Sequence, residues 1–423
     1  MKRISVIGFG KIGQAIAANI LDHGHIVMAI DISEELASSF NDGRFTTKEP
    51  GIQEILLRAY REKKLCVSSD SSAVKNSDAI IVAIPLLIDP QKKILQEPFL
   101  DAFQKIAPYL EKNLPVIVET SMPVGFGRNS VVTAIESMGK KHGNDFLLAH
   151  SPERIKSGTM MAQLKQIPKV IGGVTKQATE ATYQIYSSFF DPSMLNVVES
   201  IEAAEMIKLA GMIYRDFNIA LSNQLAQFAD AVNVSFADLI PLINTDKEAD
   251  LLYPGIGVGG HCTPVYPYFL IQNFKEAGLD FTLARDSRQI NDAMPAYAVS
   301  LIKDRVKNKT ALVLGLGFRP NVKEDAVSIT YLLSEELANA GFTVSVHDVE
   351  FSADEIRSKG FSAGEIYSGN AEVVFLATMH KEYYGLDFEK LYESGVRIFV
   401  DGRNSVDRNK VTDAGITYIG IGR

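Results

Sequence analysis

A glycine-rich turn between an apolar strand and an apolar helix constrains the fold of this 423-residue chain more than any other feature. Residues 3–7 (Arg-Ile-Ser-Val-Ile) predict a buried strand, and the glycines of residues 8–13 lead into a helical apolar pattern that continues to Leu21. A second predicted strand, residues 25–30, ends at Asp31. Strand, tight turn, helix and strand in this order predict a βαβ unit with two parallel strands.

Further strand-like runs, residues 79–84 and 115–118, are separated by polar helical stretches. This alternation is typical of a parallel sheet covered on both faces by helices. The character changes at residues 202–232, which contain no proline and place apolar side chains at helical spacing. They predict one long helix of roughly 45 Å, at about 1.5 Å per residue, which suits a connector and the interface of a homodimer. Two shorter helices broken near Gly211 are the alternative.

The opening pattern returns near the end of the chain. Residues 310–314 and 343–347 predict strands, and residues 332–340 predict the helix between them. The glycine turn of this copy, residues 315–317, lacks the third glycine and is followed by a longer loop, residues 318–328. We therefore interpret it as a degenerate copy that binds a different phosphate or none.

These patterns predict an α/β fold with two Rossmann-like, doubly wound parallel-sheet domains joined by a central helical dimerisation region that contains the long helix. We place the first domain at residues 1–200, the central region at residues 201–300 and the second domain at residues 301–423. A chain of this length needs more than one hydrophobic core, which agrees with such a division.

Composition excludes several classes of function. A hydrophobic share of 46% and a charged share of 22% are those of a soluble globular protein, and no apolar run reaches the ~18 residues of a membrane span. The net charge of −8 argues against nucleic acid as a partner. The two cysteines, Cys66 and Cys262, give no disulfide framework. We expect a cytoplasmic protein that has no membrane partner, and we predict no metal site.

The first glycine turn predicts a dinucleotide site. In Gly8-x-Gly10-x-x-Gly13 the first glycine permits the tight turn, the second lets the backbone approach a pyrophosphate, and the third allows close packing of helix on strand. The helix N-terminus supplies amides for the phosphates. Asp31 is placed to accept hydrogen bonds from the adenosine ribose, and its charge repels a ribose phosphate, so we expect NAD rather than NADP. A glycine turn without a ligand is the alternative.

One cysteine lies in a glycine-rich loop, residues 257–264 (Gly-Val-Gly-Gly-His-Cys-Thr-Pro), which we call the cysteine loop. Glycines at this density let the backbone approach a ligand closely. A thiol beside exposed amides suits nucleophilic catalysis, which makes Cys262 the candidate nucleophile. In the alternative interpretation, Cys262 only fills a small apolar gap.

Several motifs occur in an order that resembles one enzyme family. They are residues 119–125 (Glu-Thr-Ser-Met-Pro-Val-Gly), 151–154 (Ser-Pro-Glu-Arg) with Gly158, 205–209 (Glu-Met-Ile-Lys-Leu), the cysteine loop, 318–321 (Phe-Arg-Pro-Asn) and 401–404 (Asp-Gly-Arg-Asn). Together they resemble the UDP-glucose/GDP-mannose dehydrogenase family, in particular its UDP-N-acetylhexosamine and mannosaminuronate-forming branch, over essentially the whole chain. The resemblance implies oxidation of the primary alcohol of a nucleotide sugar to a carboxylate by two NAD in succession. Such products feed surface polysaccharide or a specialised glycoside.

The resemblance also implies catalytic roles for particular residues. Cys262 would attack the aldehyde made by the first oxidation, giving a thiohemiacetal and then a thioester that water releases as the acid. Lys208 would lie near the reacting oxygen, and Glu153 would activate the water. Ser121 replaces the threonine usual in the family and keeps a hydroxyl that could hold a water.

For two of these residues a purely structural role is the alternative. Lys208 could be a solvated helix lysine paired with Glu202 or Glu205. Glu153 could form a simple ion pair with Arg154.

The predicted ligand contacts come from the glycine turn, the cysteine loop and the family motifs. The best basic contacts for a substrate diphosphate are Arg319 and Arg403, because arginine binds phosphate with a bidentate fork. The resemblance implies a substrate between the domains. The predicted cofactor-binding residues are Gly8, Phe9, Gly10, Lys11, Ile12, Gly13, Asp31, Pro85, Ser121 and Glu153. The predicted substrate-binding residues are Arg154, Lys208, Met212, Tyr253, Gly257, Gly259, Gly260, Phe318, Arg319 and Arg403.

Four positions depart from the family pattern. Met212 stands for an asparagine, Tyr266 for an aspartate, Glu248 for an arginine of the sugar site, and Ala326 for an arginine in the loop after the second glycine turn. We favour the usual oxidation on an unusual sugar. The alternatives are a reaction that stops after two electrons and a non-catalytic protein that binds NAD and a nucleotide. A 3-hydroxyacid dehydrogenase is a further alternative, and it predicts no role for Cys262.

Overall fold

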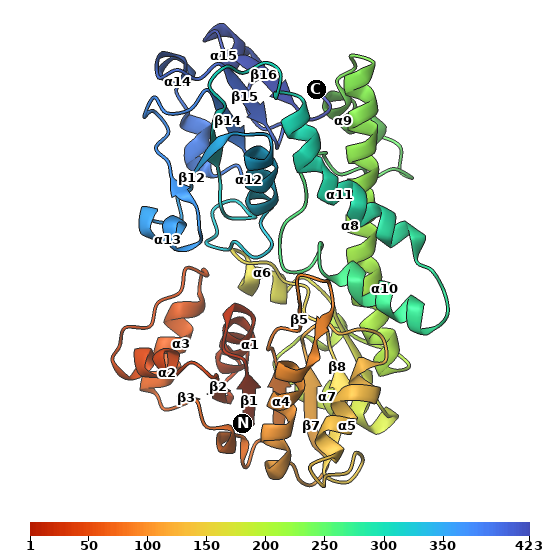
Figure 1. Cartoon of the computed structure of the whole chain (residues 1–423). Coiled ribbons are helices and arrows are strands. Elements are labelled where there is room, and N and C mark those ends of the chain that lie inside the picture. The colour runs from red at the N-terminus through yellow and green to blue at the C-terminus, as the bar shows by residue number, and fades with distance from the viewer. The chain divides into compact units, whose positions relative to one another are not determined.

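The computed structural model describes the backbone of residues 1–423 and all side chains except that of Asn41. The chain divides into two compact units, residues 1–210 and 211–423 (Figure 1). The three-part division at residues 200 and 300 stays a prediction, because the boundary between the compact units falls inside the long helix.

The first unit is built on an eight-stranded sheet with the order β10-β9-β8-β7-β4-β1-β2-β3. Its strands are β1 (Arg3–Ile7), β2 (Ile26–Ile30), β3 (Leu65–Ser68), β4 (Ala79–Val82), β7 (Leu114–Val118), β8 (Phe146–His150), β9 (Lys169–Gly173) and β10 (Leu195–Val197). A separate antiparallel ribbon pairs β5 (Leu87–Ile88) with β6 (Ile94–Leu95). The strands predicted for this unit are confirmed with small shifts at their ends.

The fold class is confirmed, and two antiparallel strands are added to the predicted parallel sheet. All pairs from β3 across to β8 are parallel. β9 runs antiparallel to β8, with Ala149 opposite Gly173 and His150 opposite Gly172, and β10 is parallel to β9. The segment between β8 and β9 carries only the short helix α6 (Met160–Leu164), and an antiparallel neighbour needs no crossover helix.

Helices pack on this sheet around buried apolar side chains. They are α1 (Lys11–Asp22), α2 (Glu34–Asn41), α3 (Ile52–Arg61), α4 (Gln96–Ile106), α5 (Val132–Glu136), α6 and α7 (Lys176–Tyr186). Single turns lie at Ser71–Val74, Ala107–Tyr109, Gly127–Val131 and Pro192–Met194. One core joins Val6 of β1 and Val27 of β2 to Ile16 of α1 and Leu56 of α3, and all four side chains are almost fully buried. Gly10 is the N-cap of α1, so the glycine turn and the start of this helix form one structure.

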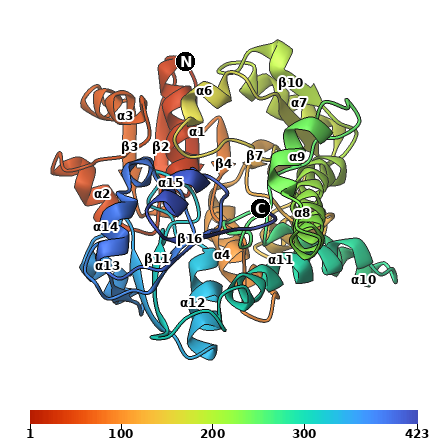
Figure 2. The ribbon, with the colours of Figure 1, turned by 90° about the horizontal axis from the view of Figure 1, so that it is seen from above.

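The long helix α8 (Ile201–Ala231) is continuous through Gly211, which confirms the single-helix prediction. Figure 1 shows it as one unbroken coil, and Figure 2 looks nearly along it. The alternative of two helices broken at Gly211 is therefore wrong. A glycine inside a helix costs only about 1 kcal/mol relative to alanine, which the neighbouring turns can offset.

The second unit holds a six-stranded sheet in the order β13-β12-β11-β14-β15-β16, parallel throughout. Its strands are β11 (Thr310–Leu314), β12 (Thr343–His347), β13 (Ser362–Ala363), β14 (Val373–Leu376), β15 (Ile398–Asp401) and β16 (Thr417–Gly420). Its helices after α8 are α9 (Phe236–Ile243), α10 (Tyr266–Glu276), α11 (Thr282–Ser300), α12 (Ile329–Asn339), α13 (Ala353–Ser358), α14 (Phe388–Glu393) and α15 (Arg408–Asp413), with a single turn at Lys381–Gly385. The predicted strands are confirmed, and α12 begins three residues before its predicted start at residue 332.

Both faces of the second sheet are covered, as in a doubly wound fold. Val313 of β11 packs with Leu333 of α12 and Ala298 of α11 in one core. Leu312 of the same strand packs on the opposite face with Leu391 of α14. Alternate residues of one strand therefore serve two cores.

Candidate functional site

The glycine turn after β1 has the shape that dinucleotide binding requires. Gly8 has φ +85°, and a Cβ at this position would lie 2.7 Å from the side chain of Ile84. A Cβ at Gly13 would lie 1.9 Å from the carbonyl oxygen of Gly8, so α1 packs directly on the turn. A Cβ at Gly10 would meet no atom within 4 Å. Packing therefore explains the first and third glycines but not the second, which fits the close approach of a pyrophosphate.

Asp31 follows β2 and lies beside this turn. Its Oδ2 accepts a hydrogen bond from the amide of Phe9 at 2.7 Å, and its Oδ1 accepts one from the amide of Ser33 at 3.0 Å. The side chain is half-buried, and a carboxylate can accept further hydrogen bonds from ribose hydroxyls. Lys11 and Ile12, in the first turn of α1, are half-buried as well. The turn, the helix N-terminus and this carboxylate together fit the adenosine half of NAD.

A buried ionic cluster lies where β7 and β8 end and β9 begins. Lys169 Nζ donates to Glu153 Oε2 at 2.9 Å and to Glu119 Oε2. The side chains of Lys169 and Glu153 are 4% and 7% exposed. The hydroxyl of Tyr186 donates to the second oxygen of Glu119. The single ammonium of Lys169 thus offsets part of the negative charge of two buried carboxylates.

The antiparallel direction of β9 explains how this cluster forms. Continuing the register in which Ala149 lies opposite Gly173 places Lys169, the first residue of β9, opposite Glu153 beyond the end of β8. In a parallel strand the same lysine would begin at the other end of the sheet. The reversal of one strand therefore brings a cation to Glu153.

The two carboxyls of the cluster differ in proton affinity. Burial raises the pKa of Glu119 to about 7, with the charge of Glu153 adding to the shift and Lys169 opposing it. Burial acts in the same direction on Glu153, but Lys169 and the amides of Arg154 and Ile155 hold the pKa of this carboxyl below its usual value. Burial disfavours the charge of Lys169, yet both carboxylates hold its pKa above its usual value. Glu153 therefore stays ionised, and Glu119 is the carboxyl that takes up a proton near neutrality.

The partner of Glu153 differs from the predicted alternative. The carboxylate pairs with Lys169, whereas the guanidinium of Arg154 donates to the carbonyl of Pro168. Arg154 contributes its backbone amide to Glu153 Oε1 at 2.5 Å. Sequence reasoning missed Lys169, although a lysine at the head of the buried run Lys-Val-Ile-Gly-Gly was a visible signal.

The loop that carries Ser121 is fastened to α8. Ser121 is buried in this loop. Glu205 of α8 accepts hydrogen bonds from the amides of Gly125 at 2.6 Å and Gly127 at 2.9 Å. Burial raises the pKa of Glu205 to about 8, although these two amides lower it. A buried carboxyl thus fixes the backbone just after Ser121.

Lys208 lies half-buried on α8, close enough for its charge to act on the buried His150 at the end of β8. Burial lowers the pKa of His150 to about 3, and the charges of Lys169 and Lys208 contribute. The neutral ring therefore donates from Nδ1 to the carbonyl of Val118 at 2.8 Å. Met212, one helical turn after Lys208, is also half-buried.

The ion-pair alternative for Lys208 named Glu202 and Glu205. Glu202 pairs with Arg128 at 2.6 Å, and Glu205 holds the backbone amides described above. Both carboxylates are therefore bonded to other groups.

In the second unit, the cysteine loop packs tightly on the protein's own chain. Gly257 has φ +133°, and a Cβ there would lie 2.2 Å from the side chain of Ile329. A Cβ at Gly259 or Gly260 would lie 2.8 Å or 2.9 Å from Phe318. Packing against the chain itself therefore accounts for glycine at these three positions. The predicted contacts of these residues with substrate stay predictions.

Cys262 lies just before helix α10. Its carbonyl accepts the amides of Val265 at 3.1 Å and Tyr266 at 2.9 Å, which starts the helix. Its Sγ lies 3.5 Å from the hydroxyl of Tyr266. The side chain is half-buried and bonded to a polar group, which argues against the alternative of a simple gap filler.

Three predicted substrate residues lie around this loop. A guanidinium nitrogen of Arg403 lies 3.4 Å from where a Cβ of Gly255 would be, just before the cysteine loop. Burial lowers the pKa of Arg403, although Asp401 opposes the shift. The guanidinium of Arg319 lies over the ring of Phe318, 5.3 Å from its centre. The structure thus brings Phe318 against the cysteine loop and Arg403 against Gly255 just before it, with Arg319 beside Phe318.

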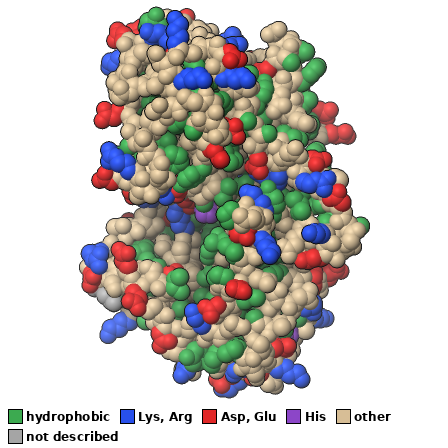
Figure 3. All heavy atoms as spheres, in the orientation of Figure 1, with side chains coloured by type: hydrophobic (Ala, Val, Ile, Leu, Met, Phe, Trp, Pro, Cys, Tyr) green, Lys and Arg blue, Asp and Glu red, His purple; other side chains and the backbone are tan. Residues whose placement is uncertain are grey.

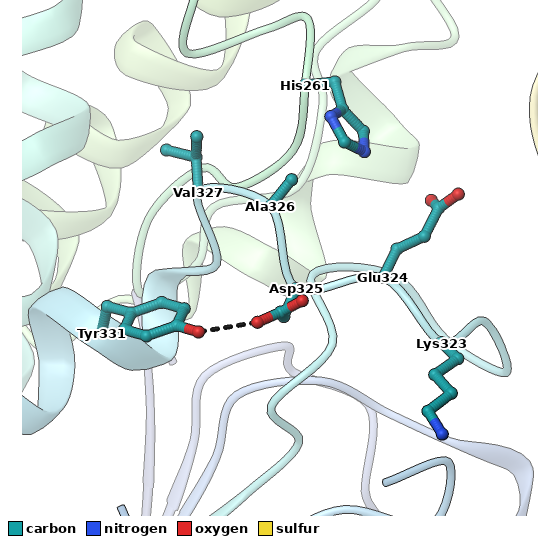
Figure 4. Close-up of a pocket in the computed structure, with 7 residues that line it drawn as sticks. All are labelled: His261, Lys323, Glu324, Asp325, Ala326, Val327 and Tyr331. Carbon is teal, nitrogen blue, oxygen red and sulfur yellow. Dashed lines mark hydrogen bonds between the residues drawn. The ribbon is translucent and has the colours of Figure 1, made fainter. Parts of the chain in front are cut away.

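A pocket of ≈ 490 Å³ opens beside the cysteine loop (Figure 4). It is lined by His261, Lys323, Glu324, Asp325, Ala326, Val327 and Tyr331. The hydroxyl of Tyr331 donates to Asp325 at 2.6 Å. The carbonyl of Ala326 accepts the amide of Gly260 at 3.1 Å, and Val327 has φ +47°, an unusual conformation for a β-branched residue. The loop of residues 318–328, in which Ala326 departs from the family pattern, therefore hydrogen-bonds to the cysteine loop.

The second glycine turn is closed by the protein itself. Asp348 Oδ2 accepts the amides of Leu316 at 2.6 Å and Gly317 at 2.9 Å, and lies 3.2 Å from Nε2 of the buried His380. From the first turn, Asp31 accepts the amide of Phe9. The amides that a pyrophosphate would need are thus used internally, in agreement with the prediction of a degenerate copy.

Other predicted residues lie at the surface. Pro85, Tyr253 and Glu248 are exposed. Nothing in their surroundings assigns them to a ligand, so their roles stay predictions.

Comparison with known proteins matches the first unit to an NAD binding domain and the second unit to a UDP binding domain. Models of the UDP-glucose/GDP-mannose dehydrogenase family match three consecutive parts of the chain: the NAD binding domain at residues 2–190, the central domain at residues 202–293 and the UDP binding domain at residues 312–408. The chain belongs to the UDP-glucose/GDP-mannose dehydrogenase family. It is therefore an NAD-dependent oxidoreductase acting on CH–OH groups, and its membership decides against a 3-hydroxyacid dehydrogenase.

Related proteins are similar over the full length. A UDP-N-acetyl-D-mannosamine dehydrogenase of Pyrococcus horikoshii is 31% identical, with 100% of this chain and 99% of the relative covered. An NDP-N-acetyl-D-galactosaminuronic acid dehydrogenase of Ralstonia nicotianae is 27% identical, with 95% and 96% covered. The solved structure of UDP-D-ManNAc dehydrogenase from Pyrococcus horikoshii has a TM-score of 0.90 at 30% identity, with 100% of this chain and 99% of that chain covered.

Among the residues that the structure describes, no helix is long and apolar enough to cross a membrane. Within the same described set, no three His, Cys, Asp or Glu side chains are grouped so as to hold a metal ion. On the face shown in Figure 3, acidic and basic side chains are interspersed.

Proposed function

We propose that the protein oxidises the primary alcohol of a UDP-sugar to the carboxylate in two NAD-dependent steps, through a thioester on Cys262. The observation that carries the proposal is the position of Cys262, half-buried beside a hydroxyl on a loop that Phe318 and Arg403 contact or adjoin. Relatives named for UDP-N-acetyl-D-mannosamine and N-acetyl-D-galactosaminuronic acid favour a UDP-N-acetylhexosamine as the substrate.

The cofactor would be held by the first glycine turn, with pyrophosphate at Gly10 and adenosine ribose at Asp31. Phe9, Lys11 and Ile12 adjoin it, and Pro85, Ser121 and Glu153 are proposed contacts of the nicotinamide half. When bound, NAD accepts the hydride that leaves the substrate carbon in each oxidation. The open space at Gly10 supports this assignment.

The role of Cys262 follows from thiolate chemistry. Its sulfur attacks the aldehyde carbon, a C–S bond forms, and the carbonyl electrons move to oxygen, which gives a thiohemiacetal after protonation. Loss of a hydride from that carbon and of the hydroxyl proton leaves a thioester. The ammonium of Lys208 would stabilise negative charge on the reacting oxygen in both steps.

Release of the acid needs a water molecule and a group that orients it. We assign this role to Glu153, with Ser121 as a second holder of the water. The lowered pKa of Glu153 makes it a weak base, so we propose that it orients the water as a permanent carboxylate. The buried Glu119, whose pKa is raised to about 7, is the proposed proton acceptor connected to it through Lys169.

The substrate diphosphate is assigned to Arg319 and Arg403, with Phe318 and the backbone of the cysteine loop beside it. The amide of Gly260 is engaged by Ala326, so Gly257 and Gly259 are the better candidates for a backbone contact. Arg154, Met212 and Tyr253 are kept as further contacts of the sugar or the base.

A coupled assay of nicotinamide reduction tests the proposal. Purified protein would be offered UDP-, GDP- and dTDP-sugars with NAD, and with NADP as the matched control. Two NADH per sugar with a UDP-N-acetylhexosamine would support full oxidation. One NADH per sugar would favour the two-electron alternative. No NADH across the panel would favour the non-catalytic alternative.

We further propose a cytoplasmic homodimer that contributes to polysaccharide biosynthesis. Both cysteines are free thiols, as in a reducing compartment. Along α8 in the second unit, apolar side chains on one helical face stay exposed: Tyr214, Leu221, Leu225 and Phe228. Phe228 is 66% exposed, and such a stripe usually faces a partner.

Sedimentation velocity tests the dimer. Phe228→Glu should shift the protein toward monomer, whereas Gln224→Glu, which adds the same charge at an exposed polar position of α8, should do so less. A wild-type protein that is monomeric at every concentration would contradict the proposal.

A further inference from the structure

Tyr266 lies against the sulfur of Cys262, at the position where the family pattern has an aspartate. The amide of Tyr266 donates to the carbonyl of Cys262, so the two residues stand one helical turn apart at the start of α10. This arrangement places the phenol oxygen 3.5 Å from Sγ. Both side chains are half-buried.

The ring of Tyr266 is held in place by a buried neighbour. Its centroid lies 5.4 Å from that of Phe269, which is fully buried one turn further along α10. A phenol fixed in this way can direct its hydroxyl at the sulfur with little loss of rotamer entropy. The contact between Tyr266 and Cys262 is therefore supported by the packing of the Tyr266 ring at the start of α10.

We propose that Tyr266 is a catalytic residue whose hydroxyl donates a hydrogen bond to the Cys262 thiolate. The proposal rests on the proposed function of Cys262 as the nucleophile. A phenol O–H is a good donor and an anionic sulfur is an acceptor, and hydrogen bonds to charged groups are stronger than those between neutral groups. An aspartate at this position would instead bring a negative charge to the thiolate.

The same hydrogen bond acts when the acid is released. Water adds to the acyl carbon and gives a proton to a base, the C–S bond breaks, and its electron pair returns to sulfur. The hydroxyl of Tyr266 stabilises the departing thiolate, so release of the acid becomes easier in the same way as formation of the nucleophile. Tyr266 thus supplies to the sulfur a hydrogen-bond donor that an ionised aspartate would not supply.

Other charged groups also face the cysteine loop in the second unit. His261 belongs to the loop itself, and Lys323 and Glu324 come from the loop that packs against it and line the same pocket. The test therefore compares variants of one protein, in which these groups are unchanged.

The experiment measures alkylation of Cys262 by iodoacetamide as a function of pH, with mass spectrometry of the intact protein. It is done in a Cys66→Ser background, because Cys66 is exposed and would also react. Tyr266→Phe keeps the ring and removes the hydroxyl, and its midpoint should move up by about one pH unit, the tenfold effect expected of one hydrogen bond to a charged group. Tyr266→Asp should move the midpoint at least as far, through repulsion.

Tyr268→Phe is the matched control, because it removes a hydroxyl from the same helix two residues away; its midpoint should not move. Far-UV circular dichroism and melting curves identify any variant that fails to fold, and Tyr266→Phe, which removes only the hydroxyl, is the variant that decides. A Tyr266→Phe midpoint equal to that of the parent would overturn the proposal.

Alkylation needs neither substrate nor NAD, so the two proposals fail separately. If the alkylation midpoint shifts in Tyr266→Phe but the wild-type protein oxidises no nucleotide sugar, the hydrogen bond to the thiolate is supported and the proposed function is contradicted. If the wild-type protein oxidises a nucleotide sugar but the midpoint of Tyr266→Phe equals that of its parent, only the role of Tyr266 is contradicted.

Discussion

Lys169 Nζ lies 2.9 Å from Oε2 of Glu153, and the same ammonium donates to Glu119. Removing one partner of a buried ion pair leaves an uncompensated charge, which typically costs 3–5 kcal/mol. Lys169→Met should therefore lower the free energy of unfolding by about that amount. It should also raise the pKa of Glu153, which the ammonium now holds down.

Urea unfolding measures the loss of stability, and the pH profile of acid release measures the change at Glu153. Lys169→Arg keeps the charge and should therefore retain part of the stability and part of the lowering of the pKa of Glu153. Lys165→Met, at an exposed position, should change neither the stability nor this pKa. A Lys169→Met variant with the wild-type pH profile would show that the cluster is structural only.

Two glycines of the first turn should respond differently to alanine. Gly10→Ala meets no atom within 4 Å, so the fold should persist while the methyl group obstructs the pyrophosphate. We expect NAD binding to weaken by about tenfold or more, as for loss of a hydrogen bond to a charged group. Gly13→Ala puts a Cβ 1.9 Å from the carbonyl oxygen of Gly8, so it should destabilise the protein.

Calorimetric titration with NAD and thermal unfolding separate the two effects. If Gly10→Ala bound NAD like the wild-type protein, the pyrophosphate would not lie at this turn.

Glu205 should make stability depend on pH. Its pKa is raised to about 8 in the folded protein from the usual 4.5, so the folded state binds the proton more tightly than the unfolded state. Stability should therefore fall as the pH rises from about 4.5 to about 8, by up to a few kcal/mol, since one pKa unit corresponds to about 1.4 kcal/mol.

Melting temperatures across this range should decline more steeply for the wild-type protein than for Glu205→Gln, which carries no proton to lose. Glu202→Gln, next to it on α8 and partly exposed, is the control. Equal slopes for wild type and Glu205→Gln would contradict the assignment.

Local pattern was enough to predict much of the fold. The strand at residues 3–7, the glycine turn and the helix after it are indicated by continuous apolar runs and by the glycines between them, and both elements are largely buried. The continuity of α8 followed from the absence of proline and the regular apolar spacing. These features depend on neighbours in sequence, so the sequence shows them directly.

The ionic cluster could not be predicted, because its members meet only through the reversed strand β9. Lys169 and Glu153 are 16 residues apart, and their pairing depends on the antiparallel register with β8. The glycines of the cysteine loop were interpreted as allowing a ligand to approach the backbone, and this interpretation did not include their packing against the chain itself. Their close neighbours, Phe318 and Ile329, belong to a loop and helix much later in the chain.

The amount of NADH and of sugar acid formed by Cys262→Ser tests the central claim most directly. With the substrate identified by the nucleotide-sugar panel, the wild-type protein and Cys66→Ser should each form two NADH per carboxylate. Cys262→Ser should form carboxylate about 10³-fold more slowly or not at all, because hydroxyl is a far poorer nucleophile and leaving group than thiolate. Carboxylate formation by Cys262→Ser at the wild-type rate would contradict the account.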